Sequence, residues 1–152
     1  DRALFELLIL ETFQAGLSWE CVLNKQEAFR RAFDDFDWDK VAAYDEARQA
    51  ALYADPGIIR NRRKIAAAVG NAAVFTAIRQ EFGSFDSYLW QWTGGKTLVE
   101  RGPTTSPLSD AISKDLKKRG MKFVGSTIIY AYLQAVGVLY AHEPGCFLEA
   151  AP

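Results

Sequence analysis

The sequence has few of the residues that build cross-linked or membrane-embedded proteins. Its 152 residues include only two cysteines and one histidine, so we exclude a disulfide scaffold and expect a reducing, cytoplasmic compartment. No apolar run reaches the ~18 residues that a membrane span needs, so no membrane partner is expected. No signal peptide is expected either. Because the only methionine is Met121, we expect the chain to lack an N-terminal segment that precedes Asp1.

A strong net charge is also lacking, since the total is −1. About half of the residues are hydrophobic and a quarter are charged, which is typical of one compact globular domain over residues 1–152. The charges are nevertheless grouped, with acidic residues in 34–39 and basic residues in 60–64 and 117–122. Such clusters are most often solvated faces, although basic ones can also contact phosphate.

The hydrophobic pattern predicts an all-α protein, because no alternation long enough for a strand is present. Ser18, Asp37 and Asp45 are expected to cap short helices, and Pro56-Gly57 interrupts the chain before a long helix. The predicted helices cover 2–13, 18–23, the region of 27–33, short segments after 37 and 45, then 58–79, 88–92, 109–118 and 126–139.

Two glycine-containing segments could bind phosphate. WTGGKT lacks the earlier glycine and the preceding strand of a Walker loop, so we reject that motif. In LKKRGMKFVGST, a helix ends at Gly120 and another begins after Gly125, with Lys122 between them. This tight hairpin could bring backbone N–H groups and a helix N-terminus to a phosphate. An ordinary connection between two helices explains the same residues equally well.

Glu11 falls on the apolar face of the first predicted helix, with Leu4, Leu7 and Leu8. An ionised carboxylate on such a face needs a partner. Trp19 lies near it in the sequence, after the turn at 14–17. An acid beside an aromatic plane could bind a flat, cationic ligand, but Trp19 could also be an ordinary core residue.

His142 and Cys146 are four residues apart and are both competent zinc ligands. A zinc site needs three or four ligands, and the only other cysteine, Cys21, lies in an apolar run. From the residues alone, an incidental pair and half of a metal site both remain open.

Taken together, these stretches resemble the 3-methyladenine DNA glycosylase I family of the Tag type. The resemblance extends from the first residue to the last and is most specific in its first and third motifs. It implies a helical bundle with a helix-hairpin-helix element at about 109–139, which excises 3-methyladenine from double-stranded alkylated DNA at the bacterial nucleoid. The matching stretches are LExxQAGLSWxxVL (10–23), DPGIIRNRRKI (55–65), SDAISKDLKKRGMKFVGSTIIY (109–130) and HEPGC (142–146).

The resemblance also implies residue roles. Glu11 would be the catalytic carboxylate and, with Trp19 as stacking wall, would bind the flipped base, while free 3-methyladenine would be the product. Thr12 and Phe13 depart from the family pattern, and we place Phe13 with the base-binding residues. Gln14, Gly16 and Leu17 would probe the gap left in the duplex. The hairpin residues that would grip backbone phosphate are Gly120, Lys122, Val124, Gly125, Ser126 and Thr127.

Family members also carry a structural zinc. Here His142 and Cys146 would supply two of four ligands, and the other two would precede Asp1. The catalytic aspartate of many helix-hairpin-helix glycosylases is missing from QAVGVLYAHEPGC, as it is in the Tag type. We therefore expect a monomeric, monofunctional glycosylase without lyase activity. The rival interpretations are a non-catalytic helix-hairpin-helix DNA-binding or structural module and a helical small-molecule enzyme.

Overall fold

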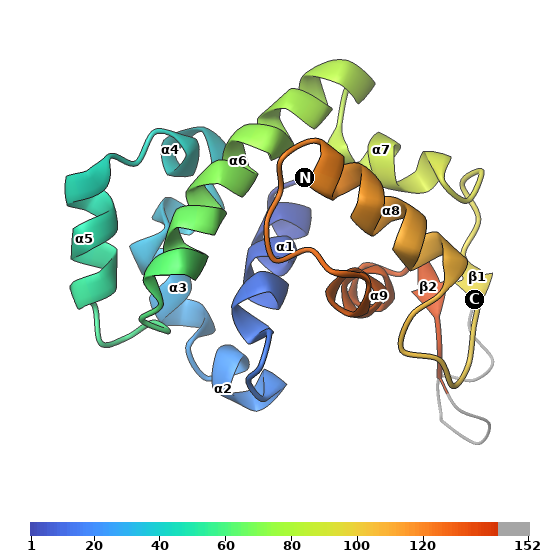
Figure 1. Cartoon of the computed structure of the whole chain (residues 1–152), viewed down its shortest axis with the longest axis horizontal. Coiled ribbons are helices and arrows are strands. Elements are labelled where there is room, and N and C mark those ends of the chain that lie inside the picture. Colours follow the sequence, from blue (N-terminus) through green and yellow to red (C-terminus); the bar gives the residue numbers. More distant parts are fainter. Residues whose placement is uncertain (143–152) are drawn as a thin grey trace.

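The computed structural model describes residues 1–142 and shows short helices packed around one long helix (Figure 1). The predicted all-α class is confirmed. The helices are α1 (Arg2–Gln14), α2 (Trp19–Leu23), α3 (Gln26–Ala32), the 3₁₀ turn η1 (Asp34–Phe36), α4 (Trp38–Ala42), α5 (Glu46–Ala54), α6 (Arg62–Phe82), α7 (Phe85–Gln91), α8 (Pro107–Lys118) and α9 (Ser126–Ala135). The strands are β1 (Leu98–Val99) and β2 (Leu139–Tyr140).

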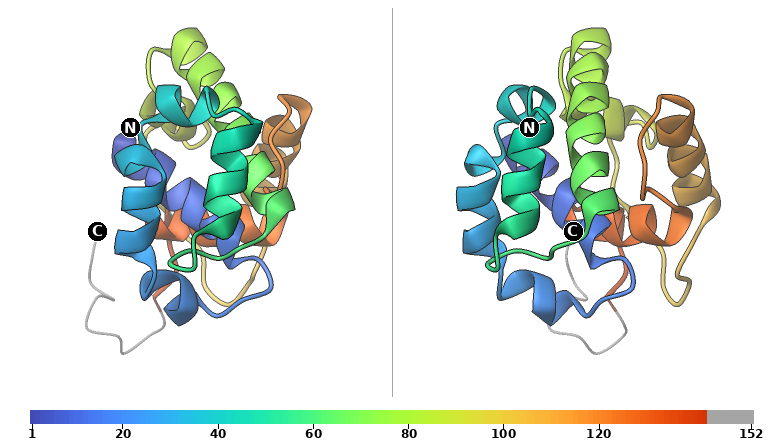
Figure 2. Two further views of the ribbon diagram at one scale, coloured as in Figure 1. Left: turned by 90° about the vertical axis from the view of Figure 1, so that its left-hand side faces the viewer. Right: turned by 60° about the vertical axis from the view of Figure 1, so that its left-hand side comes forward.

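Helix α6 runs through the middle of the molecule. In the right panel of Figure 2, it stands between the blue-to-teal helices α3–α5 on one side and the orange α8 on the other. Its buried face follows the helical period through Ile65, Ala68, Ala72 and Phe75. Small alanines on this face allow α1 and α4 to pack against α6. Buried side chains from the helices form one continuous hydrophobic core, and no helix described within residues 1–142 could cross a membrane.

Helix α1 lies against both α6 and α9. Its second half is buried on all sides, from Leu8 to Phe13. A helix surrounded in this way is expected to be hydrophobic all round rather than amphipathic. The Tyr132 hydroxyl of α9 donates to the Leu4 carbonyl at 2.9 Å, which fixes α9 along α1. This packing buries the side chain of Glu11 where α1 faces its neighbouring helices.

Side-chain caps start several helices as predicted. Ser18, Asp37 and Asp45 each accept a hydrogen bond from a backbone N–H in the first turn of α2, α4 and α5. Three predicted starts were wrong by about one turn or less, including that of α7, which begins at Phe85 after its cap Ser84 rather than at Tyr88. Helix α6 begins after Asn61, which caps it, rather than at Ile58. Helix α8 begins at Pro107, because Ser106 and Ser109 form a capping box ahead of the predicted start.

The C-terminal end of α9 and the two short strands also differ from the prediction. Helix α9 ends at Ala135 instead of continuing to residue 139, because Gly137 takes a left-handed conformation with φ +83°. The chain then enters β2, which pairs in parallel with β1, Leu98 facing Leu139. A two-residue strand is too short to produce a detectable alternation in the sequence.

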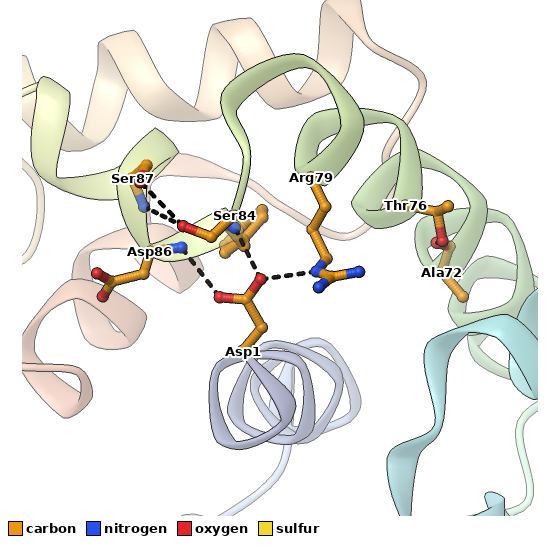
Figure 3. Close-up of polar contacts among 8 residues, drawn as sticks. Asp1, Ala72, Thr76, Arg79, Ser84, Asp86 and Ser87 are labelled. Atoms are coloured by element: carbon orange, nitrogen blue, oxygen red, sulfur yellow. Dashed lines mark hydrogen bonds and ion pairs between the residues drawn. The ribbon is translucent and has the colours of Figure 1, made fainter.

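Asp1 joins the start of α1 to α6 and α7 (Figure 3). Its carboxylate accepts from Arg79 Nε at 2.7 Å, from the Phe85 N–H at 2.9 Å and from the Asp86 N–H at 3.2 Å. The two backbone donors belong to the first turn of α7, where N–H groups have no partner within the helix. One largely buried carboxylate therefore ties three helices together.

Candidate functional site

A cavity of about 490 Å³ lies between α1, α2, α9 and β2. Glu11 and Gln14 come from α1, and Trp19 comes from α2. This volume suits a small planar molecule. The remaining lining residues come from α9, β2 and the two residues after it: Ala131, Gln134, Ala135, Leu139, Ala141 and His142.

Glu11 lies at the wall of this cavity with only 4% of its surface exposed. Burial raises the pKa of its carboxyl to about 7, and desolvation is the cause. The carboxyl therefore titrates near neutral pH instead of being fully ionised there. A cation that entered the cavity would favour the ionised form and would in turn be attracted by it.

Trp19 is the first residue of α2, directly after the capping residue Ser18. Its half-buried indole both packs against the hydrophobic core and lines the cavity. The two interpretations of this tryptophan are thus compatible. The cavity combines an aromatic surface with a buried acid, a pair suited to a flat ligand that carries positive charge.

The loop between α1 and α2 is a tight turn. The Leu17 N–H donates to the Gln14 carbonyl at 2.7 Å, and Gln14 Nε2 donates to the Leu17 carbonyl at 2.8 Å. Gly16 adopts φ +80°, which a side chain would disfavour. Leu17 is 39% exposed. The turn therefore holds an apolar side chain in solvent from a well-defined backbone, beside the cavity that Gln14 lines.

Helices α8 and α9 pack against each other and are joined by the hairpin 119–125. Gly120 has φ +105° and Phe123 has φ +58°, so the backbone turns tightly twice. Lys122 is exposed.

Gly125 precedes α9 and offers no side-chain cap to its first turn, where Thr127 is exposed. The Ser126 hydroxyl donates to Asp110 Oδ1 at 2.5 Å, so this side chain holds α9 against α8.

Two residues predicted to contact ligand have side chains in the core. The Phe13 ring is fully buried and meets Phe29 with ring centroids 4.9 Å apart, so it does not line the cavity. It belongs to the core because the last turn of α1 is covered on that side by α3. The Val124 side chain is likewise buried, and its carbonyl accepts from Ser113 Oγ at 2.6 Å. Only the backbone N–H of Val124 could reach a ligand.

The sequence did not single out Gln134, Lys64 or Asn71. Gln134 lines the cavity from α9. Lys64 was grouped with exposed basic residues, but it is only 7% exposed and lies on the buried face of α6, as does Asn71. The helical period could have indicated that Lys64 and Asn71 are buried, since positions 64, 68 and 71 share one face of a helix.

The predicted metal ligands are only partly described. His142 lies at the cavity, its ring centroid 4.8 Å from that of Tyr140, and its carbonyl accepts from Arg101 Nε at 2.8 Å. Cys146 lies outside the described residues. Within residues 1–142, no three His, Cys, Asp or Glu side chains are grouped to hold a metal ion.

Comparisons with known proteins agree on one family. The family model described as methyladenine glycosylase matches residues 1–149. DNA-3-methyladenine glycosylase 1 of Escherichia coli K12 is 44% identical over 96% of this chain and 81% of its own. A crystal structure of 3-methyladenine DNA glycosylase I (TAG) has a TM-score of 0.92 at 43% identity, covering 99% of this chain and 85% of that one. The Staphylococcus aureus TAG structure that concerns 3-methyladenine recognition has a TM-score of 0.94 at 36% identity, covering 99% and 84%.

Proposed function

This chain belongs to the methyladenine glycosylase family, and from that premise we propose that it hydrolyses the N-glycosidic bond of 3-methyladenine in alkylated DNA. The observation that carries the proposal is the position of Glu11, a buried acid on the wall of a cavity that Trp19 also lines. Relatives named DNA-3-methyladenine glycosylase support the reaction class.

The chemistry of the lesion fits this cavity. Methylation at N3 gives the adenine in DNA a positive charge, which weakens its bond to the sugar. Glu11 can accept a hydrogen bond from the exocyclic amine and complement that charge, while Trp19 stacks on the ring. Neutral adenine would gain less from either contact. The base must first be rotated out of the double helix to reach the cavity.

We propose that the loop 14–18 and the hairpin 119–125 bind the duplex. Leu17, exposed on its fixed turn, would fill the gap left by the rotated base, next to Gln14. The hairpin would bind a backbone phosphate through its N–H groups and the N-terminus of α9, with Lys122 adding charge. These contacts do not read base edges, so binding would be independent of sequence and sensitive to salt.

We further propose that the reaction is simple hydrolysis without strand cleavage. A lyase needs an amine nucleophile that can form a Schiff base with the sugar. Among residues 1–142, the cavity lining contains no lysine. The positive charge of the lesion already makes the base a good leaving group, so the protein needs to supply little further activation.

Release of 3-methyladenine from methylated DNA tests the proposal. Replacing Glu11 by Gln should slow release about 10- to 100-fold, because a neutral amide loses the attraction to the cation. Trp19→Ala should cost about 10-fold or more, since stacking is worth roughly 1–3 kcal/mol per base. The matched control is Glu20→Gln, an exposed carboxylate one residue after Trp19, which should leave release unchanged.

Wild-type rates in both Glu11 and Trp19 variants would refute the site. Duplex binding that weakens steeply with salt, without any base release by the unmodified protein, would instead support a non-catalytic DNA-binding module. A protein with no salt-sensitive affinity for duplex DNA would fit neither and would point to a small-molecule enzyme.

A further inference from the structure

Helix α6 carries two buried polar side chains on one face, Lys64 and Asn71, which are 7% and 1% exposed. They are seven residues apart, or two helical turns, which separates them by about 10 Å along the axis. Each makes two hydrogen bonds to the backbone of a segment about fifty residues away in the sequence. The two segments are the loop 14–18 with the end of α1, and the hairpin 119–125.

Lys64 holds the α1–α2 loop. Its ammonium donates to the Phe13 carbonyl at 2.9 Å and to the Ala15 carbonyl at 2.7 Å. These carbonyls belong to the C-terminal end of α1, where acceptors lack a partner within the helix and a cation is favoured. Burial lowers the pKa of Lys64, which shows that its surroundings disfavour the charge. An exposed lysine or a water molecule could donate to these carbonyls at a lower desolvation cost. The use of a buried lysine therefore indicates that the loop needs a fixed geometry.

Asn71 holds the hairpin. Its Oδ1 accepts from the Lys122 N–H at 2.9 Å, and its Nδ2 donates to the Lys122 carbonyl at 2.9 Å. This paired contact satisfies both backbone groups of one residue, as a neighbouring β-strand would. The contact lies directly beside Phe123, whose φ of +58° is unfavourable for a residue with a side chain.

The hairpin also meets α6 at its first residue, where Arg119 Nη1 donates to Glu81 Oε2 at 2.6 Å, but next to Lys122 the two are separated. A hollow of about 270 Å³ lies between them, lined by Arg63 and Gly70 of α6 and by Gly120, Lys122 and Phe123 of the hairpin. Side-chain packing therefore does not fill the space next to Lys122. The amide of Asn71, at the edge of this hollow, is what fixes the backbone of Lys122 relative to α6.

We propose that Lys64 and Asn71 are positioning residues that set the distance between the two segments that engage DNA. The inference rests on the proposed function, because it requires the loop 14–18 and the hairpin to contact the same duplex. One rigid helix with two fixed attachment points keeps the base-replacing loop and the phosphate-binding hairpin in register. Neither side chain lines the Glu11 cavity, so neither is expected to touch the base.

The test replaces Lys64 with Met and Asn71 with Leu, and uses Thr76→Val as the matched control on α6. Among residues 1–142, Thr76 donates to the Ala72 carbonyl of its own helix at 3.1 Å and makes no hydrogen bond to either segment. For each protein, the measurements are affinity for an intact duplex, affinity for a duplex with an abasic-site analogue, affinity for free 3-methyladenine, and the melting temperature.

The two variants should produce different patterns. Lys64→Met should weaken binding to the abasic duplex about tenfold and binding to the intact duplex about twofold at most, because the loop acts only where a base is displaced. Asn71→Leu should weaken both about tenfold, because the hairpin contacts backbone in either. Affinity for the free base should stay within about twofold in both, and Thr76→Val should match wild type throughout.

Milder variants keep the test decisive if Lys64→Met or Asn71→Leu does not fold. Lys64→Arg retains two N–H donors and should restore most of the abasic-duplex affinity. Asn71→Asp retains the acceptor for the Lys122 N–H but cannot donate to the carbonyl, so it should still weaken duplex binding several-fold.

Folded Lys64 and Asn71 variants with wild-type affinity for both duplexes would overturn the inference. So would an equal loss of duplex and free-base affinity, which would indicate general destabilisation. Base release by the unmodified protein tests the proposed function separately. If wild type binds both duplexes but releases no base, the positioning inference remains measurable while the glycosylase proposal fails.

Discussion

At the scale of single residues, Glu11 combines two opposing effects. Its burial on α1 costs free energy whenever the carboxyl is ionised, since burial removes most of the water that would solvate the charge. The same lack of solvent strengthens its attraction for a cation in the cavity. A site of this kind sacrifices stability at neutral pH to obtain selectivity for a positively charged ring, and the two effects can be measured separately.

The stability cost predicts a pH dependence for Glu11→Gln. The folded-state pKa of about 7 exceeds the ordinary value of 4.5, so the protonated carboxyl favours folding below pH 4.5, and this contribution is lost as the pH rises through 7. The Gln variant, neutral at every pH, should match wild type near pH 4.5 and be more stable by about 3 kcal/mol at pH 8. Thermal unfolding at both pH values, with Glu20→Gln as control, measures the difference; equal wild-type and Gln stabilities at pH 8 would contradict it.

Some residues of the site could be predicted from the sequence and others could not. Glu11 stood out because a charge on an apolar face is conspicuous, and Trp19 because it follows a glycine turn. Lys64 was obscured by its basic neighbours, since a cluster of like charges usually faces solvent. Phe13 was misplaced because the sequence does not show which side of α1 α3 covers.

At the scale of secondary structure elements, α6 owes its role to its length and to the small side chains on its buried face. Gly70 lies inside it at an exposed position where an added Cβ would meet no atom within 4 Å. Glycine in a helix interior raises the free energy of the helix relative to alanine. The hairpin glycine differs, because Gly120 has φ +105° and needs the freedom that glycine provides.

These two glycines therefore predict opposite effects. Gly70→Ala should stabilise the protein by roughly 0.5–1 kcal/mol, and Gly120→Ala should destabilise it by about 1–2 kcal/mol. Denaturant unfolding with a constant slope measures both changes. Destabilisation by Gly70→Ala would show that the hollow between α6 and the hairpin cannot accept a methyl group, which the open space around Gly70 argues against.

The capping residues explain which elements the sequence predicts well. Ser18, Asp37 and Asp45 mark helix starts through a local hydrogen bond, so their effect is contained in a few adjacent residues. The end of α9 also has a local signal, the left-handed Gly137, but the predicted helix ran past it. The strand that follows could not be predicted, because β2 pairs with β1 about forty residues earlier in the chain and pairing over that distance has no local pattern.

At the scale of the whole molecule, residues near both ends of the described chain meet at one cavity. Glu11 and Trp19 come from α1 and α2, while His142 is the last described residue. The chain spans 81% of the Escherichia coli relative. Any segment of a longer protein that binds next to His142 would lie beside the proposed base site. A metal ion held by His142 would lie beside that site as well.

We predict about one zinc ion per chain in a longer form that includes residues preceding Asp1, held by His142, Cys146 and two upstream ligands. The residues present are suitable in type, and the zinc would hold the chain end in place. Elemental analysis of the purified protein should show loss of the metal in His142→Ala and in Cys146→Ser. Cys21→Ser should retain it, and a zinc-free longer form would reject the prediction.

The short ladder between β1 and β2 links a surface crossing to the cavity. Thr97 Oγ1 donates to the Gly137 carbonyl at 3.0 Å, and the N–H groups of Leu98 and Glu100 donate to the carbonyls of Val138 and Tyr140 at 3.0 Å each. The stretch that carries Leu139, Ala141 and His142 is thereby anchored to a segment that touches no part of the cavity. Proteolytic nicking between residues 101 and 105 would free one end of that anchor. The expected effect is a weaker affinity for the purine, although none of residues 101–105 lines the cavity.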